Sequence, residues 1–212
     1  MSKVKLKHAS GNSMSIAAPA TNPASDLELK LPATIGTANQ YLKNGSTPGT
    51  LEFGTVTIPA AGITEADQYR LSSGFTGSAD PVTSNWERND TNFALIGDGV
   101  GQASGVFTFP STGIWKVDSK VVASKTSDAY YVWCFLKLTT DGTNYNIIAY
   151  GNSSINHASN TYYAEAHAGA LINVTNNTDF KVTTNYSTDG ATVAGNSGQM
   201  MSGITFLKLG TT

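Results

Sequence analysis

The sequence has little charge and a single cysteine. Only 13% of its 212 residues are Asp, Glu, Lys or Arg, against roughly a quarter in an average soluble domain. With a net charge of −2 we expect no basic surface for nucleic acid, and one cysteine excludes an intrachain disulfide. No apolar run reaches the roughly 20 residues of a membrane-spanning helix. The N-terminal lysines are not followed by an apolar segment, so we expect no secretory signal.

Short strand-like segments dominate the chain from about Asp67 onward. They are rich in aromatic and β-branched residues, and turn signals such as Asp141–Gly142 and Asp189–Gly190 separate them. Eight or more short strands at such spacing indicate a sandwich, jelly roll or barrel. The only helix candidate is weak and lies around Thr64–Tyr69. The sequence therefore predicts an all-β protein whose core lies after residue 67.

The first sixty residues have a different character. Residues 1–26 are mostly small and polar, and such a segment buries too little apolar surface to order itself. We expect an extended anchoring arm that orders on a larger particle; a disordered tail is the alternative. Residues 27–60 read as an apolar alternating segment and then two strands around Asn44–Gly45, which predicts a short β-hairpin. Two strands alone are marginal in water, so we expect this hairpin to need a partner.

Apolar side chains fill both faces of the segment 130–136. We expect one face to meet the domain core and the other to meet a neighbouring copy, because it is too apolar for solvent. The alternative is that strands of the same chain cover both faces. The last strand, MSGITFLKL, raises the same question. One face of segment 130–136 carries Tyr131, Trp133 and Phe135, and the other carries Tyr130, Val132, Cys134 and Leu136.

Residues 67–212 resemble the C1q and tumour-necrosis-factor jelly-roll family. The resemblance rests on the run G-x-F-x-x-P-x-x-G-x-aromatic and on a last strand of the form S-G-aliphatic-x-aromatic-L. A Leu, a polar turn and an Asp-x-x-Val strand precede that strand; Thr178 stands where the family has a second Gly. The matching positions are Gly105, Phe107, Pro110, Gly113, Trp115, Leu171, Asp179, Phe180, Lys181, Val182, Ser202, Gly203, Ile204, Phe206 and Leu207.

This resemblance implies a jelly-roll sandwich that assembles as a homotrimer, with aromatic residues of one sheet face buried around the threefold axis. We expect the trimer interface to contain Tyr131, Trp133, Phe135, Ile204 and Phe206.

Residues 27–54 resemble a segment found in tail-fibre-like and other virion proteins of bacteriophages, especially marine ones. Its pattern is L-x-L-P, a Gly-containing spacer, N-Q-x-L-x-x-G, a turn, and L-x-aromatic, here from Leu29 and Pro32 through Gly36, Asn39, Gln40 and Gly45. The resemblance implies attachment to a particle. The residues expected to make that attachment are Leu29, Leu31, Leu42, Leu51 and Phe53.

Catalytic and metal-binding motifs are absent from the sequence. The histidines His8, His157 and His167 have no ligand spacing around them. Cys134 lies among bulky apolar residues, which indicates a core or interface thiol. Calcium at the loop aspartates Asp98, Asp128 or Asp141 is an alternative to their ordinary role in turns. We expect no enzyme, no catalytic residue and no cofactor.

The combined hypothesis is a trimeric structural protein of a phage virion. Residues 1–60 would attach to the capsid or tail, and the knob would project outward as a capsid decoration or short head fibre. A tail-fibre adhesin and a free C1q-like lectin are the alternatives. The expected partners are the chain itself, virion proteins and a host surface glycan, without nucleic acid or membrane insertion. Candidate ligand contacts are Tyr130, His157, Asn160 and Tyr162.

Overall fold

The computed structural model describes residues 28–55, 62–90, 92–156 and 160–211, and before them the backbone of 3–7 and 13–17 with residues 10, 11, 21 and 23. No helix in this part of the chain could cross a membrane. The strands are β1 (Lys3–Lys7), β2 (Ser13–Ala17), β3 (Gln40–Asn44), β4 (Leu51–Thr55), β5 (Ala66–Leu71), β6 (Ser73–Thr76), β7 (Trp86–Arg88), β8 (Gly101–Ala103), β9 (Val106–Thr108), β10 (Gly113–Lys125), β11 (Ala129–Thr139), β12 (Asn146–Ile155), β13 (Tyr162–Val174), β14 (Lys181–Thr188), β15 (Thr192–Asn196) and β16 (Gly203–Gly210).

The chain forms two units, Met1–Pro59 and Ala60–Thr212. In the first unit β1 and β2 pair antiparallel, so the segment that we expected to be an extended arm contains a hairpin. Its sequence K-V-K-L-K alternates in the way a strand requires, although it is short and polar.

The β3–β4 hairpin forms where the sequence predicted strands. Leu42 lies opposite Phe53, but the connection is a loop rather than a two-residue Asn-Gly turn. Gly45 and Thr50 close that loop through a 2.9 Å backbone hydrogen bond. The segment around Lys30 runs beside the hairpin, because Lys30 accepts from Leu51 and donates to Gly49 at 2.8 Å each.

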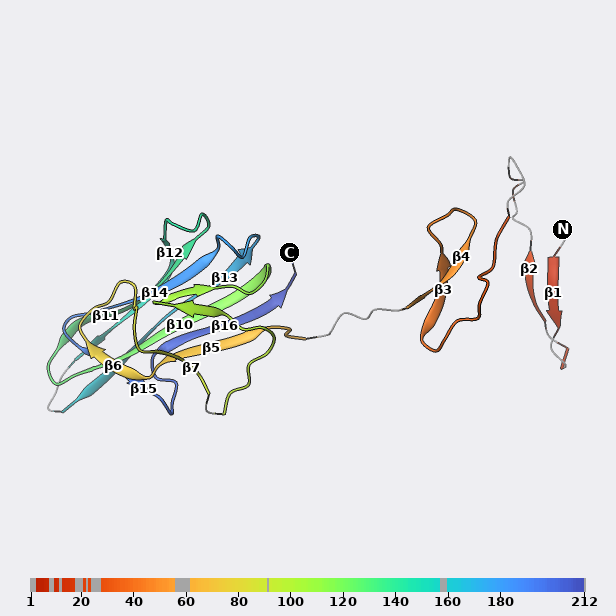
Figure 1. The fold of residues 1–212 in the computed structure, drawn as a ribbon. Coiled ribbons are helices and arrows are strands. Elements are labelled where there is room, and N and C mark those ends of the chain that lie inside the picture. Colours follow the sequence, from red (N-terminus) through yellow and green to blue (C-terminus); the bar gives the residue numbers. More distant parts are fainter. Residues whose placement is uncertain are drawn as a thin grey trace. The chain divides into compact units, whose positions relative to one another are not determined.

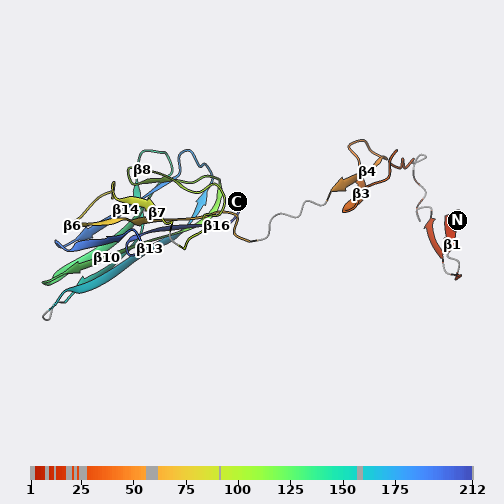
Figure 2. The same ribbon diagram turned by 60° about the horizontal axis from the view of Figure 1, so that its bottom comes forward.

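The second unit is a sandwich of two antiparallel sheets. In one sheet, β16 and then β15 pair along one edge of β10, and β13 pairs along the other edge. β5 and β7 follow beyond β16, and β6 lies beyond β15. The second sheet has the order β12-β11-β14-β9-β8. Both views of the ribbon show β10 and β13 side by side (Figures 1 and 2). The segment predicted as a weak helix, Thr64–Tyr69, contributes to strand β5 instead.

Alternating side chains of both sheets fill the space between them. In β10, every second residue from Gly113 to Ala123 is buried, as a strand with one face on the core requires. An aromatic cluster lies at the centre of this core, where Phe107 packs against Tyr69, Trp86 and Phe206 at centroid distances of 5.1–5.4 Å. Rings in such contact add specific packing to the hydrophobic effect.

The expected interface role of Ile204 and Phe206 is wrong. Both side chains are 0% exposed and lie in the core of the single chain. Phe206 also contacts Phe109 with ring centroids 6.0 Å apart. A side chain that its own sandwich covers completely has no surface left for a second copy.

Two glycines, one of them the landmark Gly105, permit close backbone approaches. Gly105 has φ +78°, and a side chain there would collide with the carbonyl of Val82. A side chain at Gly151 on β12 would likewise collide with the carbonyl of His167 on β13. Because β12 and β13 are the outer strands of different sheets, Gly151 allows the two sheet edges to approach each other.

The jelly roll has two distinct ends. At one, called the near end, β5 begins at Ala66 opposite Leu207, close to where β16 stops at Gly210. At the other, called the far end, Lys125 pairs with Tyr162. β10 runs between them for 13 residues, about 40 Å of extended chain. The chain therefore enters and leaves the jelly roll at the near end (Figure 1).

Candidate binding surfaces

Strand β11 places aromatic side chains on the outer face of the five-stranded sheet. Val132, Cys134 and Leu136 are 0% exposed in the core, which confirms that one face of this segment meets the core. Trp133 and Phe135 point the other way, and each remains partly exposed. An irregular pairing after Ala129 breaks the alternation. Tyr130 is therefore exposed, although strict alternation with Val132 and Cys134 predicts that it faces the core.

Trp133, Phe135 and Tyr150 form one cluster, called here the aromatic platform. The rings of Trp133 and Phe135 stack with an interplanar angle of 11° and centroids 5.5 Å apart. Tyr150 on β12 contacts both, at 5.5 and 6.0 Å. Tyr150 is 63% exposed. The interface role expected for Tyr131, Trp133 and Phe135 stays a prediction.

Polar, uncharged residues border the platform. Asn152 on β12 and Ser187 on β14 pair with Trp133, and Asn185 pairs with Phe135. Paired residues of neighbouring strands share a face of the sheet. The Oδ1 of Asn185 is buried and has no hydrogen-bond partner in the chain.

The outer face of the other sheet is charged. Lys116 pairs with Asp118 at 2.9 Å, and Glu165 contacts His167 at 2.5 Å and Lys120 at 3.8 Å. The hydrogen bond with His167 holds the pKa of Glu165 below its ordinary value. Beside these residues lies a shallow cavity of about 230 Å³. Positive and negative side chains are paired on this face, so it is neither a basic nor an acidic surface.

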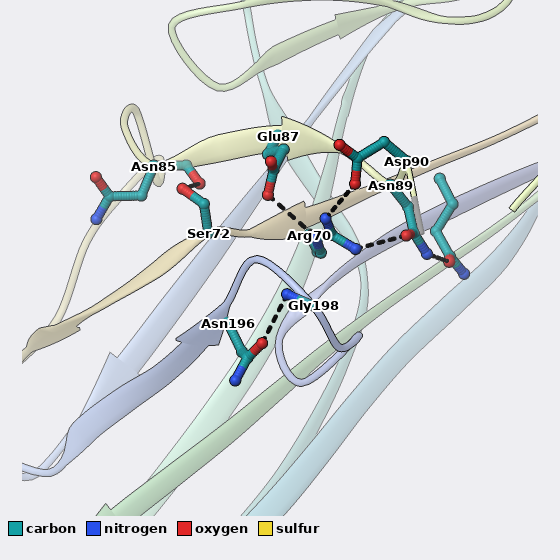
Figure 3. A network of polar contacts seen from close by, with 9 residues as sticks. Arg70, Ser72, Asn85, Glu87, Asn89, Asp90, Asn196 and Gly198 are labelled. Carbon is teal, nitrogen blue, oxygen red and sulfur yellow. Dashed lines mark hydrogen bonds and ion pairs between the residues drawn. The ribbon is translucent and has the colours of Figure 1, made fainter. Parts of the chain in front are cut away.

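Arg70 is the centre of a second polar network, shown in Figure 3. Its side chain is 1% exposed, yet the guanidinium reaches Glu87 at 3.1 Å and Asn89 and Asp90 at 2.6 Å each. Asn89 also donates to Gln68. Each of the three guanidinium nitrogens donates to one of these acceptors. The network therefore fixes β7 and the segment after it against β5.

The arrangement closest to a catalytic set lies at Ser111. Its hydroxyl is 2.7 Å from Nζ of Lys208 and donates to Glu65. A lysine must be neutral to accept a proton, whereas Lys208 is the cation of a largely buried ion pair with Glu65. The other nucleophile, Cys134, is fully buried, and burial raises its thiol pKa to about 11. Neither group is placed for catalysis.

The aspartates and histidines that the structure describes do not gather into a metal site. Within the described residues no three carboxylates, imidazoles or thiols lie together. Asp141 instead closes its own turn by accepting hydrogen bonds from Asn144, Thr143 and Thr139, and these bonds, that of Asn144 above all, lower its pKa.

Three of the four residues predicted to bind a ligand, Tyr130, Asn160 and Tyr162, lie at the far end. Tyr130 is 86% and Tyr162 36% exposed, and Asn160 is also exposed. The register that joins Ala129 to Ile155 and Lys125 to Tyr162 brings their segments together. His157 lies outside the described residues.

The residues predicted to attach to a particle are mostly uncovered in the first unit. Leu29, Leu31 and Leu42 are 63%, 74% and 47% exposed, and Leu51 and Phe53 are half-buried. Apolar residues that the chain leaves open in this way are typical of surfaces that meet a partner.

The architecture is found in known structures, although the sequence matches no known family profile and no curated protein. Eiger TNF from S. frugiperda superposes with a TM-score of 0.56 at 13% identity, over 71% of this chain and 95% of that one. Murine APRIL at pH 5.0 gives 0.51 at 11% identity, over 68% and 98%. The second unit is a TNF-like jelly roll. This confirms the fold that the sequence predicted.

Sequence reasoning missed two features of these surfaces. Tyr150 was not among the candidates, because it lies in a strand, NIIAYGNSSI, whose outward face could not be identified. The Arg70 network was also missed, since its partners come from a separate segment beyond a loop. The signal available was the acidic and amide run W-E-R-N-D, which is unusual in a chain with so little charge.

Proposed function

We propose that the protein is a homotrimeric structural protein of a phage virion surface, which displays its jelly roll outward from the particle. The observation that carries the proposal is the polarity of the jelly roll. The chain enters the jelly roll at the near end, through β5, while the exposed Tyr130, Asn160 and Tyr162 lie at the far end. A knob held in this way presents its far end to the surroundings.

The attachment side of the proposal rests on the N-terminal unit. Leu29, Leu31 and Ile35 are 63–94% exposed, and a two-stranded hairpin has no core to cover them. A larger assembly removes this apolar surface from water, at about 25 cal/mol for each Å². The resemblance of this segment to virion proteins supports a phage particle as that assembly.

The trimeric side rests on the edge that β12 and β13 form together. Each is the outer strand of its sheet, and unpaired strand edges are surfaces that proteins normally cover or protect. Ile147, Tyr163 and Leu171 are 52%, 65% and 68% exposed on these strands. We infer that a second copy covers this edge, in place of the contact that we expected through Ile204 and Phe206.

Sedimentation equilibrium of the full chain tests the trimer. The expected mass is three times 22.2 kDa, and Leu171→Asp should shift the chain towards monomer because it places a charge in an apolar contact. Leu95→Asp is the matched control and should remain trimeric, because Leu95 is also an exposed leucine (42%) but follows β7, at the opposite edge of the sheet from β13. A monomeric native chain would refute the trimer.

Electron microscopy of the parent virion tests the location. Density for the knob at the capsomers supports a decoration protein, and density at the tail supports an adhesin. Absence of the chain from purified particles would refute the virion role altogether.

A further inference from the structure

The aromatic platform alone is much smaller than a stable protein interface. A stable protein interface takes about 800 Å² and 20–30 residues from each side. Here three rings of Trp133, Phe135 and Tyr150 stand together, and the residues paired with them in β12 and β14 are Asn and Ser. The partner that fits therefore has small apolar faces set among many polar groups.

The polar border of the platform can both donate and accept hydrogen bonds. Asn152, Asn185 and Ser187 lie on the same face as the rings, and amide and hydroxyl groups offer donors and acceptors together. An amide oxygen such as that of Asn185, which lacks a partner in the chain, gains a hydrogen bond when the amide turns to meet a hydroxyl group.

The platform carries no net charge. Lys137 and Lys181 are the charged residues of β11, β12 and β14, and they lie opposite Thr183 and Thr139, beyond the platform. Asp80 neutralises Lys137 through contacts of 2.6 and 2.7 Å. The site therefore selects a neutral ligand rather than an acidic one.

We propose that the aromatic platform binds a neutral carbohydrate chain. The C–H groups on the face of a pyranose ring are attracted to the negative faces of aromatic rings, and its hydroxyl groups match the amides of Asn152 and Asn185. Tyr150 is the main contact because it is the most exposed ring of the three. The inference rests on the proposed function, since it names the ligand of the displayed knob.

Each site is open and has few convergent polar groups, so its affinity is weak. We expect a dissociation constant of about 1 mM for a single site. The three sites of a trimer, and the many knobs of one particle, together give a useful avidity. Strand β12 contributes to both surfaces, because Tyr150 and Asn152 belong to the platform and Ile147 to the edge that a second copy covers.

Isothermal titration of the full-length protein with cellohexaose, chitohexaose and maltohexaose tests this inference. At least one should bind with a dissociation constant near 1 mM, counted per protomer. Tyr150→Ala should weaken that binding at least about tenfold. Tyr41→Ala is the matched control, because Tyr41 is an exposed tyrosine of the first unit, 47% against 63% for Tyr150, and belongs to neither the platform nor the β12–β13 edge. It should leave the affinity per protomer unchanged.

Three results would overturn the assignment. The first is that none of the three sugars binds at about 10 mM. The second is that Tyr150→Ala binds as tightly as the native chain. The third is that Tyr150→Ala changes the sedimenting mass, which would make the platform a contact between copies. The titration counts sites per protomer, so a monomeric chain that still binds through Tyr150 refutes the trimer and leaves the sugar site standing.

Discussion

Replacing Phe206 by Ala distinguishes a core position from an interface position. Phe206 is fully buried and packs against Phe107 and Phe109. Deleting a buried phenyl ring loses its transfer free energy and leaves a cavity, so the free energy of unfolding should fall by about 3–5 kcal/mol. For a chain of this size the midpoint temperature should fall by roughly 6–20 °C.

Urea unfolding followed by tryptophan fluorescence measures the loss, because Trp115 lies against Phe109 with ring centroids 5.2 Å apart. Leu209→Ala is the matched control: it lies on the same strand, is 52% exposed, and should change the free energy of unfolding by less than about 1 kcal/mol. The sedimenting mass of folded Phe206→Ala should equal that of the native chain. A loss below about 1 kcal/mol together with a fall in mass would return Phe206 to the interface and refute the reasoning.

Two further predictions concern buried polar groups. The thiol of Cys134 has a pKa near 11 in the folded chain and about 8.5 when unfolded, so its contribution to stability is present below pH 8.5 and declines as pH rises towards 11. Urea unfolding at pH 8 and pH 10 should show the free energy of unfolding of the native chain falling by about 2 kcal/mol more than that of Cys134→Ala, and equal losses would contradict the burial of the thiol. Arg70→Lys should lower the melting temperature measured by calorimetry, because one ammonium group cannot reproduce the fork that bonds Glu87, Asn89 and Asp90, and an unchanged melting temperature would show that the network does not stabilise the fold.

The alternation of side chains along the strands was predictable, but which of the two faces meets the core was not always so. In β11 both faces are apolar, and the sequence does not say which one meets the core; the structure assigns Val132, Cys134 and Leu136 to it. In β16 the same ambiguity led to an error, because Phe206 reads equally well as a core or an interface residue. Only the position of the opposing sheet decides between the two.

Irregular pairing and long-range contacts set the other limits. The exposure of Tyr130 depends on a local break in the β11 register, and β15 was not predicted because T-V-A-G-N is short and lies among turn residues. The platform needs Tyr150 from a second strand, so no single segment of sequence reveals it. The landmark glycines, in contrast, mark close backbone approaches that the sequence does signal, as at Gly105.

Since both chain ends of the jelly roll lie at its near end, the turns at the far end connect only strands of the jelly roll. The Thr126–Asp128 turn, between β10 and β11, can therefore vary in length and sequence without displacing the strands that carry the knob. Foreign peptides inserted at that turn would be held some 40 Å from the junction with the N-terminal unit, which makes the turn a suitable place for grafted epitopes.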